Sequence, residues 1–404
     1  MRILLIHQNF PGQFRQLVPH LLQRGHELVA ICSHDRPLPE GERLRVLRYR
    51  EPTAGQPPLP FSSAVWHEAL QRAEAVGGLC LQLRREGWQP DRICAHSGWG
   101  ETLPLRQIWP DVPQLIWPEL WLRPDQMGAG SDSFIQVAPE QLELAQLGRN
   151  SLTRVALSMA DQWVLPTRFQ ADSLPAEFRD RRLQVVHEGI DAKQLARPNP
   201  AVSFAVAGQQ IDRSVPTLTF VNRNLERLRG FPTLMRALPL LQRAHPGLRT
   251  LIVGDNEGGY GGGHPSGKPW RQVMLEELEG QLDLGRIHFL GRIPHPQLIA
   301  LLQASTVHVY LSHPYVLGWS LLEAMACGCC IVGSQGMPVA EVISHGHDGL
   351  LVPINDHERL ADQVLELLQQ PQRREALGRA ARQTALLYDQ RLTLPAIAAV
   401  IEAS

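Results

Sequence analysis

The stretch that decides the fold is Thr306 to Pro353, TVHVYLSHPYVLGWSLLEAMACGCCIVGSQGMPVAEVISHGHDGLLVP. β-Rich residues predict a strand over 307–311, and apolar residues at helical spacing predict a helix over 320–327. Two further apolar runs, 329–333 and 350–352, predict strands. Strands and helices that alternate with short connections are typical of a parallel sheet in an α/β domain.

A ligand site is expected where this stretch passes from strand to helix. In open parallel sheets, ligands bind at the carboxyl ends of the strands, and the free N–H groups at a helix start favour a phosphate. The loop 315–319 and the first helical turn at Ser320 lie at that edge. The Ser320-x-x-Glu323 spacing is also that of a capping box, in which Glu323 bonds back to the Ser320 amide. Both interpretations of Glu323, a cap and a carboxylate that binds a ligand sugar, stay open here.

Two segments of this stretch carry a family resemblance. Gly318 followed by the run 323–328 (EAMACG), and Gly336 through Glu341 to the run 349–353 (GLLVP), resemble the nucleotide-binding half of the glycosyltransferases of family 4. That family has the α/β GT-B fold, in which two Rossmann-like domains with parallel sheets face an interdomain cleft.

The resemblance implies that the nucleotide-sugar donor is bound by Tyr315, Gly318, Trp319, Ser320, Leu321 and Glu323. One position departs from the family pattern. The family usually carries two glutamates separated by seven residues, and Tyr315 stands where the first would be. This chain therefore lacks the carboxylate with which the family's first glutamate would contact the donor sugar.

Length and net charge indicate the number of domains and the class of partner. A chain of 404 residues suits two domains, and we predict an N-terminal acceptor-binding domain over 1–200 and a C-terminal donor-binding domain over 201–385. The resemblance implies that the last helix, in 386–404, crosses back to the first domain. The net charge of −1 does not favour nucleic-acid binding.

Targeting signals and metal motifs are not evident in the sequence. The apolar run after Met1 is too short for a signal peptide, and no run approaches a membrane span, so we expect a cytoplasmic protein. A peripheral membrane contact stays open. The six cysteines lack zinc spacing and are expected to be buried.

The chain begins with a strand, a turn at Gly12, a helix and a second strand. This is a Rossmann-like opening without G-x-G-x-x-G, so a dinucleotide cofactor has weak support. The resemblance implies that Gly12 lets its loop approach the donor phosphates. The alternative is that Gly12 only serves the turn.

Two strand ends in the first half carry candidate polar residues. A strand over 92–95 runs into His96 and a glycine-rich loop that holds Glu101, and a strand over 114–117 is followed by Glu119 and Trp121. The family has a histidine facing the transferred sugar near this place, so His96 is the candidate beside the reaction centre. We place Glu101, Glu119 and Trp121 on the acceptor side, although aromatic residues are more often core.

The second half carries the candidate diphosphate site. In the family, an arginine and, six residues later, a lysine before glycine hold the donor diphosphate; here these positions are Arg223 and Arg229. Arginine can bind phosphate with a two-pronged fork, so the charge is retained. The resemblance also places Gly254, Arg292 and Ile293 beside the donor.

The predicted function is transfer of a sugar, with retention, from a nucleotide-sugar donor (a UDP-sugar) to a hydroxyl acceptor, carbohydrate or lipid-linked, in polysaccharide, glycolipid or glycoconjugate synthesis. His96, Arg223 and Arg229 are the candidate catalytic residues. No Asp-x-Asp is present, so we expect neither a metal nor another cofactor. The alternatives are a GT-B epimerase or hydrolase, a degenerate nucleotide-sugar-binding protein and, more remotely, a nicotinamide oxidoreductase.

Overall fold

The computed structural model describes residues 1–34, 41–53, 59–127, 138–195, 203–206, 208–256, 259, 261 and 263–403. The described residues form two compact units. The N-terminal unit comprises Met1–Pro124, Val137–Gly189 and Gln390–Ser404, and the C-terminal unit comprises Asp125–Gln136 and Ile190–Asp389. The chain thus enters the main part of the second unit at 190, eleven residues before the predicted start at 201, and leaves it after 389.

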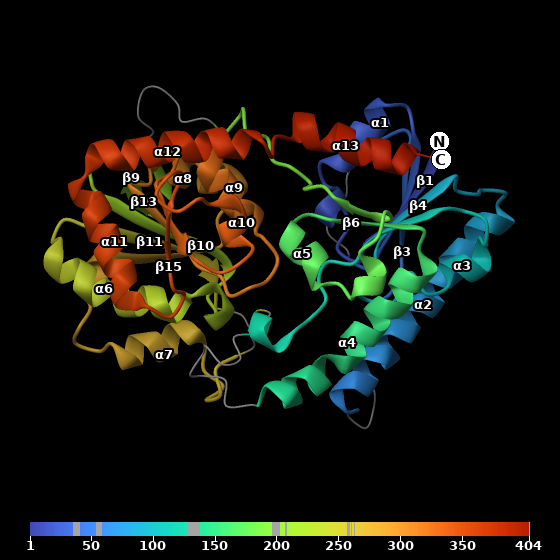
Figure 1. Cartoon of the computed structure of the whole chain (residues 1–404), viewed down its shortest axis with the longest axis horizontal. Coiled ribbons are helices and arrows are strands. Elements are labelled where there is room, and N and C mark those ends of the chain that lie inside the picture. The colour runs from blue at the N-terminus through green and yellow to red at the C-terminus, as the bar shows by residue number, and fades with distance from the viewer. Residues whose placement is uncertain are drawn as a thin grey trace. The chain divides into compact units, whose positions relative to one another are not determined.

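The N-terminal unit is a seven-stranded parallel sheet of order β3-β2-β1-β4-β5-β6-β7 (Figure 1). Its strands are β1 (Arg2–Ile6), β2 (Glu27–Cys32), β3 (Leu44–Arg48), β4 (Arg92–His96), β5 (Gln114–Trp117), β6 (Gln162–Leu165) and β7 (Leu183–Val185). Its helices are α1 (Leu17–Gln23), α2 (Phe61–Arg85), α3 (Leu105–Ile108), α4 (Pro139–Met159), α5 (Arg168–Ser173) and α13 (Gln390–Glu402), with short 3-10 turns at Gly12–Phe14 and Ala176–Phe178.

Alternation along β1 explains why both faces of this sheet are covered. Leu4 and Ile6 pack into the core shared with α2, α3, α4 and α5, whereas Ile3 and Leu5 pack into the core shared with α1 and α13. The last helix, α13, lies beside α1 (Figure 1), where Glu402 Oε2 is 2.6 Å from Arg24 Nη2. The sheet is therefore buried on both sides, as parallel sheets require.

The C-terminal unit is a six-stranded parallel sheet of order β12-β11-β10-β13-β14-β15, with a two-stranded hairpin. Its strands are β8 (Phe204–Val206), β9 (Gln209–Ile211), β10 (Thr217–Asn224), β11 (Arg249–Asp255), β12 (Ile287–Gly291), β13 (Val307–Tyr310), β14 (Ile331–Ser334) and β15 (Leu350–Val352). Its helices are α6 (Phe231–Ala244), α7 (Trp270–Glu277), α8 (His295–Ala304), α9 (Trp319–Ala326), α10 (Val339–Val342), α11 (His357–Gln369) and α12 (Pro371–Leu386), with 3-10 turns at Arg227–Arg229 and Leu284–Arg286. A further 3-10 turn is formed by Pro124–Met127.

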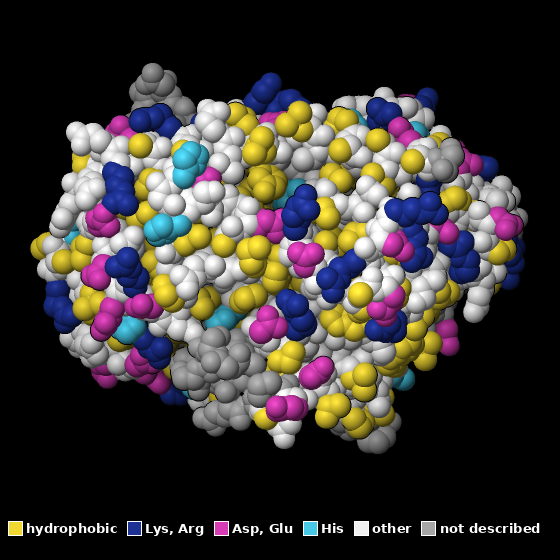
Figure 2. Space-filling view, viewed as in Figure 1, with side chains coloured by type: hydrophobic (Ala, Val, Ile, Leu, Met, Phe, Trp, Pro, Cys, Tyr) yellow, Lys and Arg dark blue, Asp and Glu magenta, His cyan; other side chains and the backbone are white. Residues whose placement is uncertain are grey.

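The fold class predicted from the sequence is confirmed: each unit is a Rossmann-like layer of parallel strands between helices. The six cysteines are buried, as predicted. On the face drawn in Figure 2, basic and acidic side chains are interspersed, in keeping with the net charge of −1. Within the described residues, no helix combines the length and apolar character that crossing a membrane requires.

Candidate functional site

Arg229 is the best-positioned cation at the strand ends of the C-terminal unit. It lies in the turn after β10, which pairs with β13 in the sheet. Its Nη1 donates to Ser312 Oγ at 2.8 Å, and its guanidinium lies 5.5 Å from the centre of the Tyr315 ring. Gly230 makes this approach possible, because a Cβ there would lie 2.3 Å from Leu311 Cβ and its φ is +68°. The two candidates from distant parts of the sequence, Arg229 and the loop after β13, are thus brought together.

The start of α9 presents a polarised helix end beside this loop. Gly318 is the N-cap, and its amide donates to Tyr310 Oη at 3.0 Å, so this amide is already used. Trp319 and Ser320 form the half-buried first turn. Leu321 is fully buried in the core, so only its backbone can take part in binding. A helix N-terminus carries a partial positive charge, which suits the phosphates of a donor.

Glu323 is not the capping residue that one interpretation of the sequence proposed. α9 begins at Trp319, its N-cap is Gly318, and no side chain caps it, so the capping box is wrong. Instead, Glu323 Oε1 lies 2.7 Å from His295 Nε2, at the start of α8. The Glu323 side chain is 14% exposed, and its carboxylate is thus held at the strand-end edge by a histidine that the sequence patterns did not single out.

The remaining donor candidates lie at the ends of β10, β11 and β12. The Arg223 side chain is exposed and makes no hydrogen bond or ion pair with the residues that the structure describes. Arg292 Nε lies 3.0 Å from Asp255 Oδ2, across neighbouring strands, and Ile293 is partly buried beside it. A Cβ on Gly254 would lie 2.8 Å from Leu225, so glycine is needed for the packing of the β11 end.

Glu226 is a buried carboxylate between the two arginines in sequence. It accepts a hydrogen bond from the Gly261 amide at 2.6 Å, and burial raises its pKa. Cβ atoms on Gly259 and Gly261 would lie 2.4 Å and 2.9 Å from this carboxyl group. The glycines of this segment therefore pack on a carboxylate.

In the N-terminal unit, Gly12 contacts His7. The Asn9 amide donates to His7 Nδ1 at 2.9 Å, so Nε2 carries the proton and bonds to Gln13 Oε1 at 3.1 Å. A Cβ on Gly12 would lie 2.4 Å from His7 Nε2, and φ at Gly12 is +47°. The structure gives Gly12 a local steric role, and its approach to donor phosphates stays a prediction.

His96 and Glu119 lie together at the ends of the paired strands β4 and β5. His96 is buried, and its Nε2 is 3.5 Å from Glu119 Oε2. The His7 and His96 rings are 4.9 Å apart. Burial, and the charge that His96 can carry, lower the pKa of His7 to about 3, so His7 stays neutral.

The other two acceptor-side candidates have local partners. Glu101 is fully buried; it accepts a hydrogen bond from Tyr49 Oη at 2.9 Å, and burial raises its pKa. Trp121 is partly buried, and the Arg154 guanidinium lies 5.3 Å from its ring centre. Sequence reasoning missed His7 and Tyr49, although His7 follows a strand and the strand-end rule applied to His96 would have found it.

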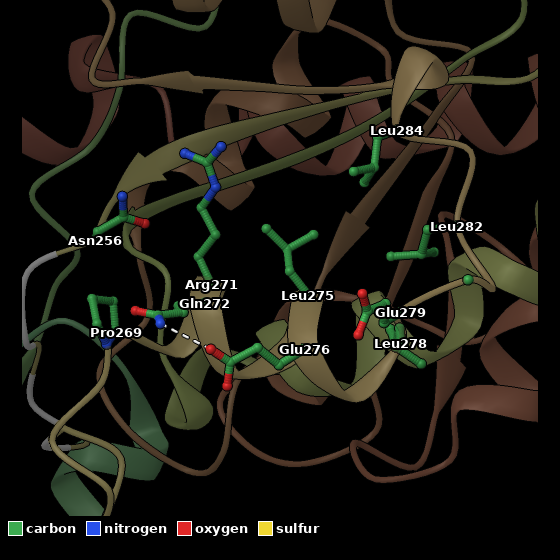
Figure 3. Close-up of a pocket in the computed structure, with 11 residues that line it drawn as sticks. Asn256, Pro269, Arg271, Gln272, Leu275, Glu276, Leu278, Glu279, Leu282 and Leu284 are labelled. Carbon is green, nitrogen blue, oxygen red and sulfur yellow. Dashed lines mark hydrogen bonds between the residues drawn. The ribbon is translucent and has the colours of Figure 1, made fainter.

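A pocket of about 560 Å³ opens beside α7 (Figure 3). Asn256, Arg271 and Gln272 line one end, and leucines 275, 278, 282 and 284 line the other. The pocket contains none of the predicted donor residues. We therefore do not assign it to the donor. Within the described part of the chain, no group of three or more His, Cys, Asp or Glu side chains could hold a metal ion.

Two protein-family models together match most of the chain. Residues 24–195 match the family described as "Glycosyl transferase family 4 group", and residues 203–384 match "Glycosyl transferases group 1".

Two relatives illustrate the range of named activities. The chain is 31% identical over 244 residues to the D-inositol 3-phosphate glycosyltransferase of Saccharomonospora viridis, covering 59% of this chain and 54% of that protein. It is 26% identical over 415 residues to the glycogen synthase of Mycobacterium tuberculosis, covering 95% of this chain and 90% of that protein. The chain thus spans about half the length of the first relative and most of the second.

A solved structure shares the fold over the whole length. Anabaena HepE in complex with UDP-glucose has a TM-score of 0.67 to this chain at 16% identity, covering 100% of each chain. At this identity the similarity shows the fold alone. The shared fold is GT-B, and it includes both units.

Proposed function

The chain belongs to family 4 of the GT-B glycosyltransferases, and we propose that it transfers a sugar from a UDP-sugar to a hydroxyl acceptor with retention of configuration. The position of Arg229 carries the proposal. Its Nη1 is anchored by Ser312, while Nε and Nη2 make no hydrogen bond to the described residues. A rigid guanidinium with free donors is suited to a diphosphate.

The proposed catalysis depends on the stabilisation of negative charge on the leaving diphosphate. As the bond between sugar and diphosphate breaks, negative charge develops on the leaving group, and fixed positive groups lower the barrier. Arg229, the exposed Arg223 and the N-terminus of α9 supply that charge. We therefore expect transfer to be independent of a metal ion. Glu323, steadied by His295, is proposed to accept hydrogen bonds from the ribose hydroxyls.

Two observations support the choice of substrates. Anabaena HepE has the same fold and was solved with UDP-glucose, which favours a UDP-sugar. The relatives named above act, by their names, on an inositol phosphate and in glycogen synthesis, which favours a hydroxyl acceptor on a carbohydrate. A lipid-linked acceptor and a peripheral membrane contact stay predictions.

The test is release of UDP from a panel of UDP-sugars, with and without added acceptors, in EDTA and in Mg²⁺. We expect release that needs an acceptor and persists in EDTA. Replacing both Arg223 and Arg229 by alanine should abolish it, whereas Arg236→Ala, a control on α6 whose side chain pairs with Glu277, should not. Acceptor-independent release would mark a hydrolase, a changed sugar without release an epimerase, and binding without turnover a degenerate binder; each would overturn the proposal.

A further inference from the structure

The chain turns sharply after β5, directly beside the end of β4. The two strands pair in parallel with His96 opposite Trp117, and the Leu120 amide then donates to Pro118 O at 2.9 Å. This is a γ-turn centred on Glu119, whose φ is +63°. Among the described residues, Glu119 is the one non-glycine residue with positive φ.

Tertiary structure holds this strained turn in place. The buried Gln170 side chain on α5 donates from Nε2 to Glu119 O at 2.6 Å. Gln170 is in turn bonded to Thr167, which caps α5 and donates to Gln170 Oε1 at 2.9 Å. Strained backbone that is held by its surroundings is concentrated at functional sites, because a relaxed turn would aim the side chain elsewhere.

The strained turn brings the Glu119 carboxylate to His96. Burial alone would raise the pKa of Glu119, but the His96 side chain and the Arg149 charge lower it below its usual value. The carboxylate is therefore ionised at neutral pH. The 3.5 Å separation from His96 Nε2 is long for a hydrogen bond, and catalytic hydrogen bonds often shorten only when substrate binds.

Within the described part of the chain, the other ring nitrogen of His96 has no hydrogen-bond partner. Nδ1 is buried and makes no hydrogen bond with the described residues. The ring is packed between His7, at 4.9 Å, and Trp99, at 6.5 Å. Next to Nδ1 stands Gly98, where a Cβ would lie 4.0 Å from that atom, so a side chain does not crowd this edge of the ring.

Glu101, the second carboxylate near His96, cannot replace Glu119. Its Oε1 is already engaged, because it accepts the hydrogen bond from Tyr49, and burial raises its pKa.

We propose that Glu119 is the positioning residue of His96: its carboxylate holds the imidazole through Nε2, which fixes the orientation of the ring and leaves Nδ1 as the nitrogen without a proton. Glu119 acts through His96 and does not itself meet the reacting atoms. The inference rests on the proposed function for its catalytic consequence, whereas the pairing of the two side chains stands independently of it.

A double-mutant cycle tests the pairing. Glu119→Leu and His96→Ala are measured singly and together in the full chain. We expect Glu119→Leu to lower kcat by about 100-fold while KM for the donor changes by less than about threefold. The double variant should be no slower than His96→Ala alone, because the two side chains act as one unit. Glu119→Gln should recover part of kcat, since its amide oxygen still accepts from Nε2. Glu86→Leu, an exposed carboxylate paired with Arg45, is the control and should keep the wild-type kcat.

Additive losses in the cycle, or a wild-type kcat in Glu119→Leu, would overturn the inference. A second readout does not need activity. In protein labelled with ¹⁵N-histidine, the His96 signal, assigned with His96→Ala, should show Nε2 protonated in the wild type and a mixture of tautomers in Glu119→Leu. Identical spectra would also refute the pairing. If the wild type transfers no sugar, the proposed function fails, and this spectrum alone decides the pairing.

Discussion

Replacing Gly12 by alanine should destabilise the N-terminal unit by about 2–4 kcal/mol. The new Cβ would lie 2.4 Å, 2.6 Å and 2.8 Å from three atoms of the His7 ring. That ring cannot move freely, because it is buried and both its nitrogens are hydrogen-bonded. Overpacking of this kind costs about 1–3 kcal/mol, and the left-handed φ of +47° adds about 1 kcal/mol for a residue with a Cβ.

Urea unfolding followed by tryptophan fluorescence measures this change. Tryptophans 66, 88, 99, 109, 117, 121 and 163 all lie in the N-terminal unit, so the signal reports mainly on it. Gly78→Ala is the control: Gly78 lies within α2 with nothing within 4 Å of an added Cβ, and alanine there should stabilise by about 0.5–1 kcal/mol. A loss below about 0.5 kcal/mol in Gly12→Ala would refute the steric role derived from His7.

Three further outcomes are expected. Arg229→Lys keeps the charge but loses the fork geometry, so kcat should fall about tenfold in steady-state kinetics, and an unchanged kcat would argue against fork-like diphosphate binding. Glu323→Gln should weaken nucleotide-sugar binding by about 1–3 kcal/mol in calorimetry, and unchanged affinity would mean that the carboxylate serves only His295. The hydrogen bonds of Glu402, first to Arg24 and then to His26, lower its pKa to about 2 from 4.5. The bonds of the ionised Glu402 carboxylate to Arg24 and His26 therefore stabilise the docking of α13 above pH 4.5. This stabilisation is lost as the pH falls through about 2 and the carboxylate is protonated. Glu402→Gln should lower Tm at pH 7, with the difference vanishing by about pH 2; a difference constant with pH would contradict this.

The helices and strands could be predicted from the sequence because their formation depends mainly on residues that are close together in the chain. The helix predicted over 320–327 is found at 319–326, and the strand over 350–352 is found with the same bounds. The candidate site residues at strand ends were also predicted from their place in the sequence, directly after a predicted strand. His96 and Glu119 lie together because the carboxyl ends of paired parallel strands share one edge.

Partners from distant segments could not be predicted in this way. His295 meets Glu323 only because α8 and α9 pack together, and spacing within either helix does not reveal it. The capping box failed for a related reason: the helix begins one residue earlier, at Trp319, and places Ser320 inside it. The strained turn at Glu119 depends on Gln170, which lies 51 residues further along the chain.

The central claim is that the C-terminal unit binds a uridine diphosphate sugar through Arg229 without a metal ion. The most direct measurement is the thermal shift of the purified chain with UDP, GDP, ADP and their sugar forms, in EDTA and in Mg²⁺. We predict a rise in Tm with UDP and UDP-sugars that is unchanged by EDTA and absent in Arg229→Ala. No shift with any nucleotide, or an equal shift in Arg229→Ala, would contradict the claim.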